Sequence, residues 1–306
     1  MDSRARIRDT ALKIDALKLW EKTASQWALL PQGSVFPYFC VAEEFKGHPI
    51  LKAHIIFLEG WQNFHDYGFW RHDHNYAFIS NPIEITAFDV MIGLDGSVQV
   101  ARTSPGFSPD FEPGEKALNL VARLLWESYG VIMRLEGEPR LVLKYAEDGA
   151  FFARKEVAPG KWEDIPLALV PPRPIVEKIA VSKDACTAVK DLPFIREMAV
   201  ELRFAPNLAC VTQEAHPRIA YDLECRNAKD GKILFSRRAL VRPPSVGIAD
   251  LWQDLAPCVL KELAKLKFVP GEIRVRTLRE FRVLRILTLE LPFKLSLRDR
   301  LDHIRY

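Results

Sequence analysis

The chain has 306 residues and a mass of 35.0 kDa, with 48% apolar and 27% charged residues. These proportions supply enough apolar side chains for packed cores, and they exclude a disordered chain, a coiled coil and a collagen-like fibre. At roughly 100–200 residues per domain, the length predicts two domains, with one large domain as the alternative.

The sequence predicts a cytoplasmic protein without a membrane segment. No apolar run approaches the roughly 20 residues of a membrane-spanning helix, and residues 1–20 carry charges at helical spacing instead of a signal peptide's apolar core. The five cysteines include no Cys-x-x-Cys pair, which indicates free thiols rather than a disulfide framework or a zinc ribbon. The glycine-rich phosphate-binding motifs and the Gly-x-Ser-x-Gly motif are also missing from the sequence, so no cofactor is predicted.

The charge is unevenly distributed along the chain. Residues 232–306 hold 16 Lys and Arg against 8 Asp and Glu, a net charge of +8, whereas the rest of the chain has a net charge of −5. A basic C-terminal quarter suits an acidic partner, including nucleic acid. It is equally suited to attraction between two parts of the same protein.

The first half of the sequence predicts a mixed α and β unit. Apolar residues at helical spacing predict a helix over 5–22, and residues 38–42 and 50–58 are predicted to be strands joined through a turn at 46–49. The Asp-Gly pair at 95–96 predicts a tight turn between strands 83–92 and 97–101, because such turns need positive φ angles.

The chain then shows a helical pattern over 113–129, and Gly130 is expected to end that helix. Strands are predicted at 131–135, 140–145 and 151–157. Residues 165–174 contain four prolines and predict an extended linker, so we expect an N-terminal module over 1–170 and a C-terminal module over 171–306.

The second half predicts a similar set of elements. We expect a strand at 198–204, a hairpin of 218–226 and 232–241 around a second Asp-Gly turn, and a helix over 250–268 in which Pro257 causes a kink or marks the true first turn. A strand at 272–276, a helix from residue 278 and a strand at 291–297 complete the chain.

The two halves resemble each other in the order of these elements. In both, an Arg follows the turn glycine by six residues, and the helix opens 19 residues after that glycine. The helices are followed by the segments 131–135 and 272–276. We interpret this pattern as a diverged internal repeat. The predicted fold class is α+β, with two strand-rich modules that each have a hairpin, a packing helix and a following strand.

In the C-terminal module, the order of three strands, helix, strand, helix and strand matches a ribonuclease-H-like fold. Nucleases of that fold need clustered carboxylates to hold two metal ions. Glu201 and Glu262 are available, but Arg274 and Arg276 stand in the fourth strand where acids would be expected, and Glu272 lies at its edge. We therefore expect the topology without the nuclease activity.

The segment Pro270-Gly-Glu-Ile-Arg-Val-Arg, followed by residues 278–287 and Leu291-Pro-Phe-Lys-Leu, resembles the C-terminal part of an uncharacterised bacterial domain family of unknown function. Domains of that family place a P-x-x-I-x-V strand before a helix and a closing strand. The resemblance covers about 40 residues. It implies a bacterial source and supports the predicted order of elements, and it implies no activity.

The most unusual stretch is WQNFHDYGFWRHDHNYAF at residues 61–78, which holds three of the seven histidines and seven aromatic residues. His72 and His74 would lie on the same side of an extended chain, and imidazole suits zinc, iron or manganese. Alternatively, this stretch is a surface loop or short helix whose aromatic side chains cap a sheet. A third interpretation is a recognition surface that contains Trp61 and Trp70.

Three hypotheses for function follow. The first is a non-enzymatic module that binds a protein partner through the aromatic–histidine stretch, the basic C-terminal quarter, or both. The second is a metal-dependent hydrolase with His65, His72 and His74 as ligands together with Asp66 or Asp73. The third is a nucleic-acid-binding protein on an inactive nuclease-like fold, and its candidate phosphate-binding residues are Arg274, Arg276, Arg279 and Arg282.

Overall fold

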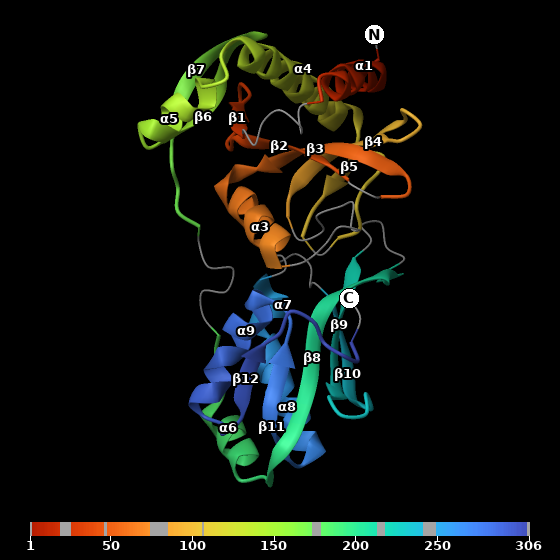
Figure 1. Ribbon diagram of the computed structural model, residues 1–306, viewed down its shortest axis with the longest axis vertical. Helices are drawn as coiled ribbons and strands as arrows, with labels where there is room; N and C mark the ends of the chain where they lie inside the picture. Colours follow the sequence, from red (N-terminus) through yellow and green to blue (C-terminus); the bar gives the residue numbers. More distant parts are fainter. Residues whose placement is uncertain are drawn as a thin grey trace. The chain divides into compact units, whose positions relative to one another are not determined.

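The computed structural model describes residues 2–18, 26–45, 48–73, 85–105, 107–172, 179–212, 218–240 and 249–304. The chain forms two compact units, each with helices and a mixed sheet (Figure 1). Unit 1 consists of residues 1–105 and 109–173, and unit 2 consists of residues 106–108 and 174–306. The α+β prediction is therefore confirmed. The boundary expected after residue 170 lies close to this division.

Unit 1 is built on a seven-stranded sheet with the order β5-β4-β3-β2-β1-β6-β7. Its strands are β1 (Trp27–Leu30), β2 (Tyr38–Glu44), β3 (Leu51–Glu59), β4 (Ala87–Gly93), β5 (Val98–Thr103), β6 (Ala150–Ala158) and β7 (Lys161–Ala168). Every pair of neighbours is antiparallel except β1 and β6. The predicted hairpin is confirmed as β4–β5, and Gly96 in its turn has a φ of +77°.

Helices cover both faces of this sheet. Helices α1 (Ser3–Ala16), α4 (Glu115–Gly137) and α5 (Leu141–Glu147) pack against one face, and α3 (Gly60–Asp73) packs against the other, as Figure 1 shows. Since side chains alternate along a strand, Phe57 belongs to the first core and Ile56 to the second. The predicted helix 5–22 is thus present as α1, and its residues from 19 on lie outside the described residues.

The region after residue 129 differs from the prediction. Gly130 does not end the helix, and the strands expected at 131–135 and 140–145 are instead the end of α4 and helix α5. Val131, Ile132 and Leu135 continue the buried face of α4. A glycine inside a helix costs about 1 kcal/mol, whereas burying one large aliphatic side chain contributes roughly 1.5–3 kcal/mol. The packing therefore outweighs the glycine.

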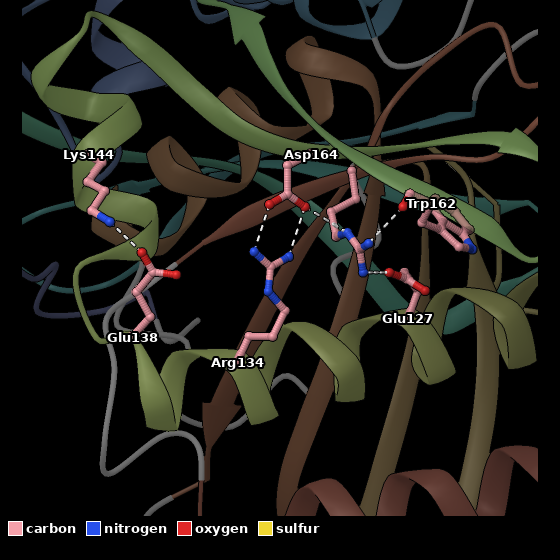
Figure 2. A network of polar contacts seen from close by, with 7 residues as sticks. Glu127, Arg134, Glu138, Lys144, Trp162 and Asp164 are labelled. Atoms are coloured by element: carbon pink, nitrogen blue, oxygen red, sulfur yellow. Dashed lines mark hydrogen bonds and ion pairs between the residues drawn. The ribbon is translucent and has the colours of Figure 1, made fainter.

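Charged side chains fix α4 to the β6–β7 hairpin (Figure 2). Both terminal nitrogens of Arg134 donate to the carboxylate of Asp164, at 2.8 and 2.7 Å. Arg154 lies between them and Glu127: it pairs with Glu127, contacts Asp164 at 3.0 Å and donates to the carbonyl oxygen of Trp162 at 2.9 Å. This network therefore sets the position of the helix on the sheet.

The linker predicted over 165–174 is partly strand. Residues 165–168 belong to β7 and pair with β6, so the linker prediction is wrong for them. Pro166 is tolerated there because β7 is the last strand of the sheet and has one neighbour only. Residues 169–172 lie outside helices and strands, and 173–178 lie outside the described residues.

Unit 2 contains a five-stranded sheet with the order β10-β9-β8-β11-β12. Its strands are β8 (Phe194–Val211), β9 (Ile219–Asn227), β10 (Ile233–Leu240), β11 (Val269–Val275) and β12 (Lys294–Leu297). β8, β9 and β10 are antiparallel neighbours, and β11 runs parallel to both β8 and β12. The predicted sequence of strands is confirmed.

The helices of unit 2 share one core with one face of this sheet. They are α6 (Lys183–Lys190), α7 (Ala249–Gln253), α8 (Leu255–Leu266), α9 (Leu278–Leu284) and the 3₁₀ helix η1 (Arg285–Leu289). The single helix expected over 250–268 is two helices that meet at Asp254. Pro257 lies in the first turn of α8, where its missing N–H has no cost.

On the opposite face of the unit 2 sheet, acidic and basic side chains alternate along and across the strands, an arrangement that we call the chequered charges. Glu201 on β8 lies between Arg226 on β9 and Arg274 on β11. Two residues further along β8, Arg203 lies opposite Glu224 on β9. Opposite charges at directly facing positions stabilise a sheet by about 0.2–1 kcal/mol per pair. The ion pairs of these arginines run along the strands, from Arg226 to Glu224 and from Arg274 to Glu272, whereas the other face is apolar.

The internal repeat stays a prediction. Both units have a hairpin, then helix, then a strand that pairs in parallel with an earlier strand. The segment 131–135, however, lies in α4, whereas its proposed counterpart 272–276 lies mostly in β11.

In the described part of the chain, the helices are too short or too polar to cross a membrane.

Candidate functional site

The aromatic–histidine stretch forms helix α3, which begins directly after β3. Gly60 makes the turn with a φ of +77°, and its N–H donates to the carbonyl oxygen of Pro37 at 2.7 Å. The rings of Trp61 and Phe64 then lie 4.5 and 4.6 Å from the ring of Phe39 on the sheet. Trp61 and Phe64, two of the residues expected to cap the end of a sheet, therefore anchor α3 to a face of the sheet, and the side chain of Trp70 and all of Tyr76 lie outside the described residues.

His65 lies at the edge of this aromatic cluster. Its ring stacks on Trp61 with centroids 5.6 Å apart and an angle of 21° between the planes. Its Nε2 is 2.7 Å from the carbonyl oxygen of Val170, in the segment that follows β7. The imidazole thus joins α3 to the main chain of a distant segment.

The extended geometry predicted for the metal ligands is wrong, because the chain is helical as far as Asp73. In a helix, His65 and His72 are separated by about 10.5 Å along the axis, at 1.5 Å per residue. The side chains of Trp70 and His72, and all of His74, lie outside the described residues. Among the residues that are described, His, Cys, Asp and Glu form no group of three that could hold a metal ion.

A cavity of about 510 Å³ lies beside Trp61, where one end of the sheet meets the start of α3. Its walls are formed by the chain before β2, the β3–α3 junction, the residue before β4 and the segment after β7: Phe36, Pro37, Glu59, Gly60, Trp61, Gln62, Asn63, Thr86, Val170 and Pro171. Asn63 supports the wall, because its Oδ1 accepts from the N–H of Thr86 at 2.8 Å. This volume is typical of a ligand or peptide-side-chain pocket.

Exposed apolar side chains gather around this cavity. In the described residues, consecutive exposed large apolar residues occur at three places, 35–36, 169–170 and 194–195. Phe36 and Val170, with 53% and 40% of their surface exposed, line the cavity, and their neighbours Val35 and Leu169 are 83% and 57% exposed. We call Phe36, Trp61, His65, Val170 and the cavity between them the α3 surface.

Trp61 and His65 were predicted from the sequence, whereas Phe36 and Val170 were not. Each of the missed residues stands next to a proline in a segment that separates strands. That combination of an apolar side chain with a turn residue is the only sequence signal for an exposed apolar position here. It does not reveal that positions 36, 61 and 170 meet.

The arginines predicted to bind phosphate are not brought onto one surface. Arg274 lies on the charged face of the unit 2 sheet, where its Nε donates to Glu272 at 2.8 Å. Arg279 belongs to α9 on the apolar face, and its guanidinium lies 5.1 Å from the ring centre of Trp252. Arg276 directly follows β11, and Arg282 is exposed on α9. The structure therefore distributes them over both sides of the sheet.

The candidate nuclease carboxylates are separated in the same way. Glu201 points to the charged face, where it accepts from the N–H groups of Asp302 and His303 at 2.8 and 2.9 Å. Glu262 lies on α8, which packs on the apolar face, and accepts from Arg237 at 2.5 Å. The sheet stands between these two carboxylates.

A buried charged cluster in unit 1 was also missed. His54 on β3 lies between Asp89 on β4 and Glu43 on β2, with Nδ1 3.4 Å from Asp89 and Nε2 3.6 Å from Glu43. Burial alone would lower the pKa of His54, but the two carboxylates outweigh it and raise the pKa to about 9. Burial raises the pKa of Asp89. A histidine between the apolar residues at the centre of the strand LKAHIIFLE is the signal that could have revealed it.

The geometry of this cluster suits a structural role better than catalysis. His54 is 4% exposed and Asp89 is fully buried, so a substrate cannot reach them without a rearrangement of the sheet. Since the carboxylates lie on different nitrogens of the ring, a single metal ion cannot be held by His54 and both of them. The cluster therefore contributes to the stability of unit 1.

Comparisons with protein-family models, with curated proteins and with solved structures find no match for this chain.

Proposed function

We propose that this chain is a non-enzymatic interaction protein whose α3 surface binds an extended apolar segment of a partner protein. The observation that carries this proposal is the gathering of two exposed apolar pairs, 35–36 and 169–170, around a cavity walled by Trp61. Contiguous exposed apolar patches mark interaction sites on soluble domains. Tryptophan beside a pocket is the residue type that contributes most binding energy at such sites.

The chemistry of the partner segment follows from what the surface already contacts. The segment at 169–172 places Val170 and Pro171 at the cavity and is held by the contact between Val170 O and His65 Nε2. A surface that combines aromatic walls with contacts to main-chain carbonyls suits an extended, proline-containing peptide. We therefore propose a partner segment of that class.

Photo-crosslinking tests this proposal. Benzoylphenylalanine replaces Phe36 in the full chain expressed in its native host, and the matched control carries it at Phe111, another exposed phenylalanine of unit 1. The proposal expects a discrete crosslinked protein from position 36 and none of that species from position 111. Equal crosslinking at both positions, or none at position 36, would refute it.

The segment of the partner that is crosslinked at position 36 is then made as a peptide, and its binding to the purified chain is measured. Phe36→Ser is expected to weaken binding without unfolding unit 1, because this side chain is half exposed. Trp61→Ala is expected to weaken it by about 30-fold, which corresponds to a hot-spot loss of about 2 kcal/mol. Circular dichroism establishes that both variants are folded.

For unit 2, we propose a ribonuclease-H-like fold without nuclease activity. The observed strand directions and the order of strands and helices support the fold. The placement of Glu201 and Glu262 on opposite sides of the sheet supports the loss of activity. Incubation with Mn²⁺ and single-stranded, duplex and hybrid oligonucleotides tests this, and cleavage above a Glu201→Gln control would contradict it.

A further inference from the structure

A second cavity, of about 660 Å³, lies in unit 2 between the β9–β10 edge of the sheet and helices α7 and α8. Eight of its fourteen lining residues are apolar, four are cationic and two are acidic. They are Phe204, Leu223, Ala239, Leu240, Leu251, Leu255, Pro257 and Cys258, then Arg218, Arg237, Arg238 and Lys261, and finally Asp254 and Glu262. A volume in the range of about 300–1,000 Å³ with mainly apolar walls is typical of a small-molecule site.

The sequence of β10 explains why this space is not filled. Phe235, Arg237 and Ala239 alternate with residues of the charged face, so they point toward the helices. Phe235 enters the core, but Arg237 extends to Glu262, and Ala239 packs against the core with a single methyl group. Beyond Phe235, this strand thus supplies little apolar volume to the core.

The charges at the cavity favour an anion. Burial alone would raise the pKa of Glu262, but donors on Lys265 and Arg237 outweigh it and lower that pKa, so this carboxylate is already neutralised by two cations. Arg238 lies on the charged face and pairs with Asp222, so the lining charges that remain are Arg218 and Lys261 against Asp254. A ligand carboxylate or phosphate would therefore meet a positive potential at the cavity.

We propose that this cavity binds an amphipathic anion, an apolar chain that ends in one anionic group. The apolar walls would cover the chain, and the anionic end would lie among the cations that include Arg218 and Lys261. A fully polar anion would bury none of the apolar surface of the walls, and a neutral chain would make no ion pair with the cations. This site is independent of the α3 surface and of the function proposed for it.

Cys258 provides a direct readout, because its half-buried thiol lines the cavity. The full chain is treated with iodoacetamide, and alkylation of the peptide that contains Cys258 is followed by mass spectrometry. Decanoate and decyl phosphate are expected to slow this alkylation at least tenfold at saturation. The comparison between them shows which anionic group is preferred. Decylamine and decanol, which have the same chain length, are expected to protect much less.

Charge reversal at an exposed position tests the anion contact without disturbing the core. Lys261→Glu is expected to weaken decanoate binding at least tenfold and to leave decanol unchanged, whereas the control Lys183→Glu, on α6 of the same unit, is expected to change neither. Ala239→Phe should fill the cavity and abolish protection while unit 2 stays folded by circular dichroism. The inference is overturned if decanoate gives no protection, if decylamine protects equally, or if both charge reversals have the same effect.

Discussion

The His54 cluster predicts an unusual dependence of unit 1 stability on pH. The pKa of His54 is raised from 6.5 to about 9 in the folded protein, because the carboxylates of Asp89 and Glu43 outweigh the effect of burial. Because the folded protein holds this proton more strongly than the unfolded chain, His54 makes its whole contribution to the free energy of unfolding below pH 6.5, and the contribution is lost as the pH rises through about 9. At 1.36 kcal/mol per pKa unit, the contribution is about 3 kcal/mol.

Asp89 acts in the same direction as His54. Burial raises the pKa of Asp89, so the folded protein also retains that proton more strongly than the unfolded chain does. An acid with a raised pKa favours the folded state less as the pH rises. Unit 1 is therefore expected to lose stability with rising pH, first as Asp89 ionises and then as His54 loses its proton.

The perturbation is His54→Gln, which keeps a polar side chain and removes the imidazolium. Removing one partner of a buried ion pair costs about 3–5 kcal/mol, so the variant should be less stable than the parent by several kcal/mol at pH 6. The difference should shrink by about 3 kcal/mol between pH 6 and pH 9.5.

Urea unfolding of a Trp252→Phe background provides the assay. Trp252 is the one tryptophan of unit 2, since the other six lie at positions 20–162. Fluorescence in that background reports on unit 1 alone, which matters because a two-domain chain need not unfold in one step. The control is His48→Gln, whose imidazole Nδ1 accepts from the N–H of Leu51 at 2.9 Å. Parallel free-energy profiles of parent and His54→Gln across this pH range would refute the reasoning.

Three further substitutions test other contacts. Glu280→Ala should destabilise unit 2 by about 2–3 kcal/mol in Trp252 fluorescence, because this buried carboxylate accepts from the N–H of Phe204 at 2.6 Å and caps α9; an unchanged urea midpoint would contradict this. Arg154→Ala should lower the stability of unit 1 more than Arg134→Ala, because the side chain of Arg154 is 17% exposed and that of Arg134 is 38% exposed. Arg134→Ala is expected to cost about 1 kcal/mol or less. The reverse order in urea unfolding would contradict this prediction. Ser296 and two arginines outweigh burial and lower the pKa of Glu272 to about 2. Glu272 should therefore stabilise unit 2 above pH 4.5, and up to about 3 kcal/mol of this stability should be lost as the pH falls to 2. The variant Glu272→Gln should lack this decline.

The strands were predictable because their information is local. Short apolar runs between turn residues located β2 and β3, alternation located β9 and β11, and Asp-Gly pairs located the turns of the β4–β5 and β9–β10 hairpins. The segment 131–135 was misassigned because Val-Ile-Met-Arg-Leu suits a strand as well as a helix. Only the buried face that it shares with the preceding turns of α4 decides between them.

The α3 surface was predictable only in part, for a related reason. Trp61 and His65 stand in a compositionally unusual segment, so the sequence indicated them. Phe36 and Val170 join them only after β2 and β7 have taken their places in the sheet, and no local pattern carries that information. The His54 cluster likewise depends on the register of three neighbouring strands.

The chequered charges of unit 2 have a consequence for how its strands align. Sliding β9 by two residues along β8 would keep every apolar side chain on the buried face, so burial alone cannot distinguish the correct alignment from these alternatives. In one direction the slide sets Glu201 against Glu224, and in the other it sets Arg203 against Arg226. Repulsion between like charges thus destabilises each misaligned sheet, and the charged face selects the correct register of β8 and β9.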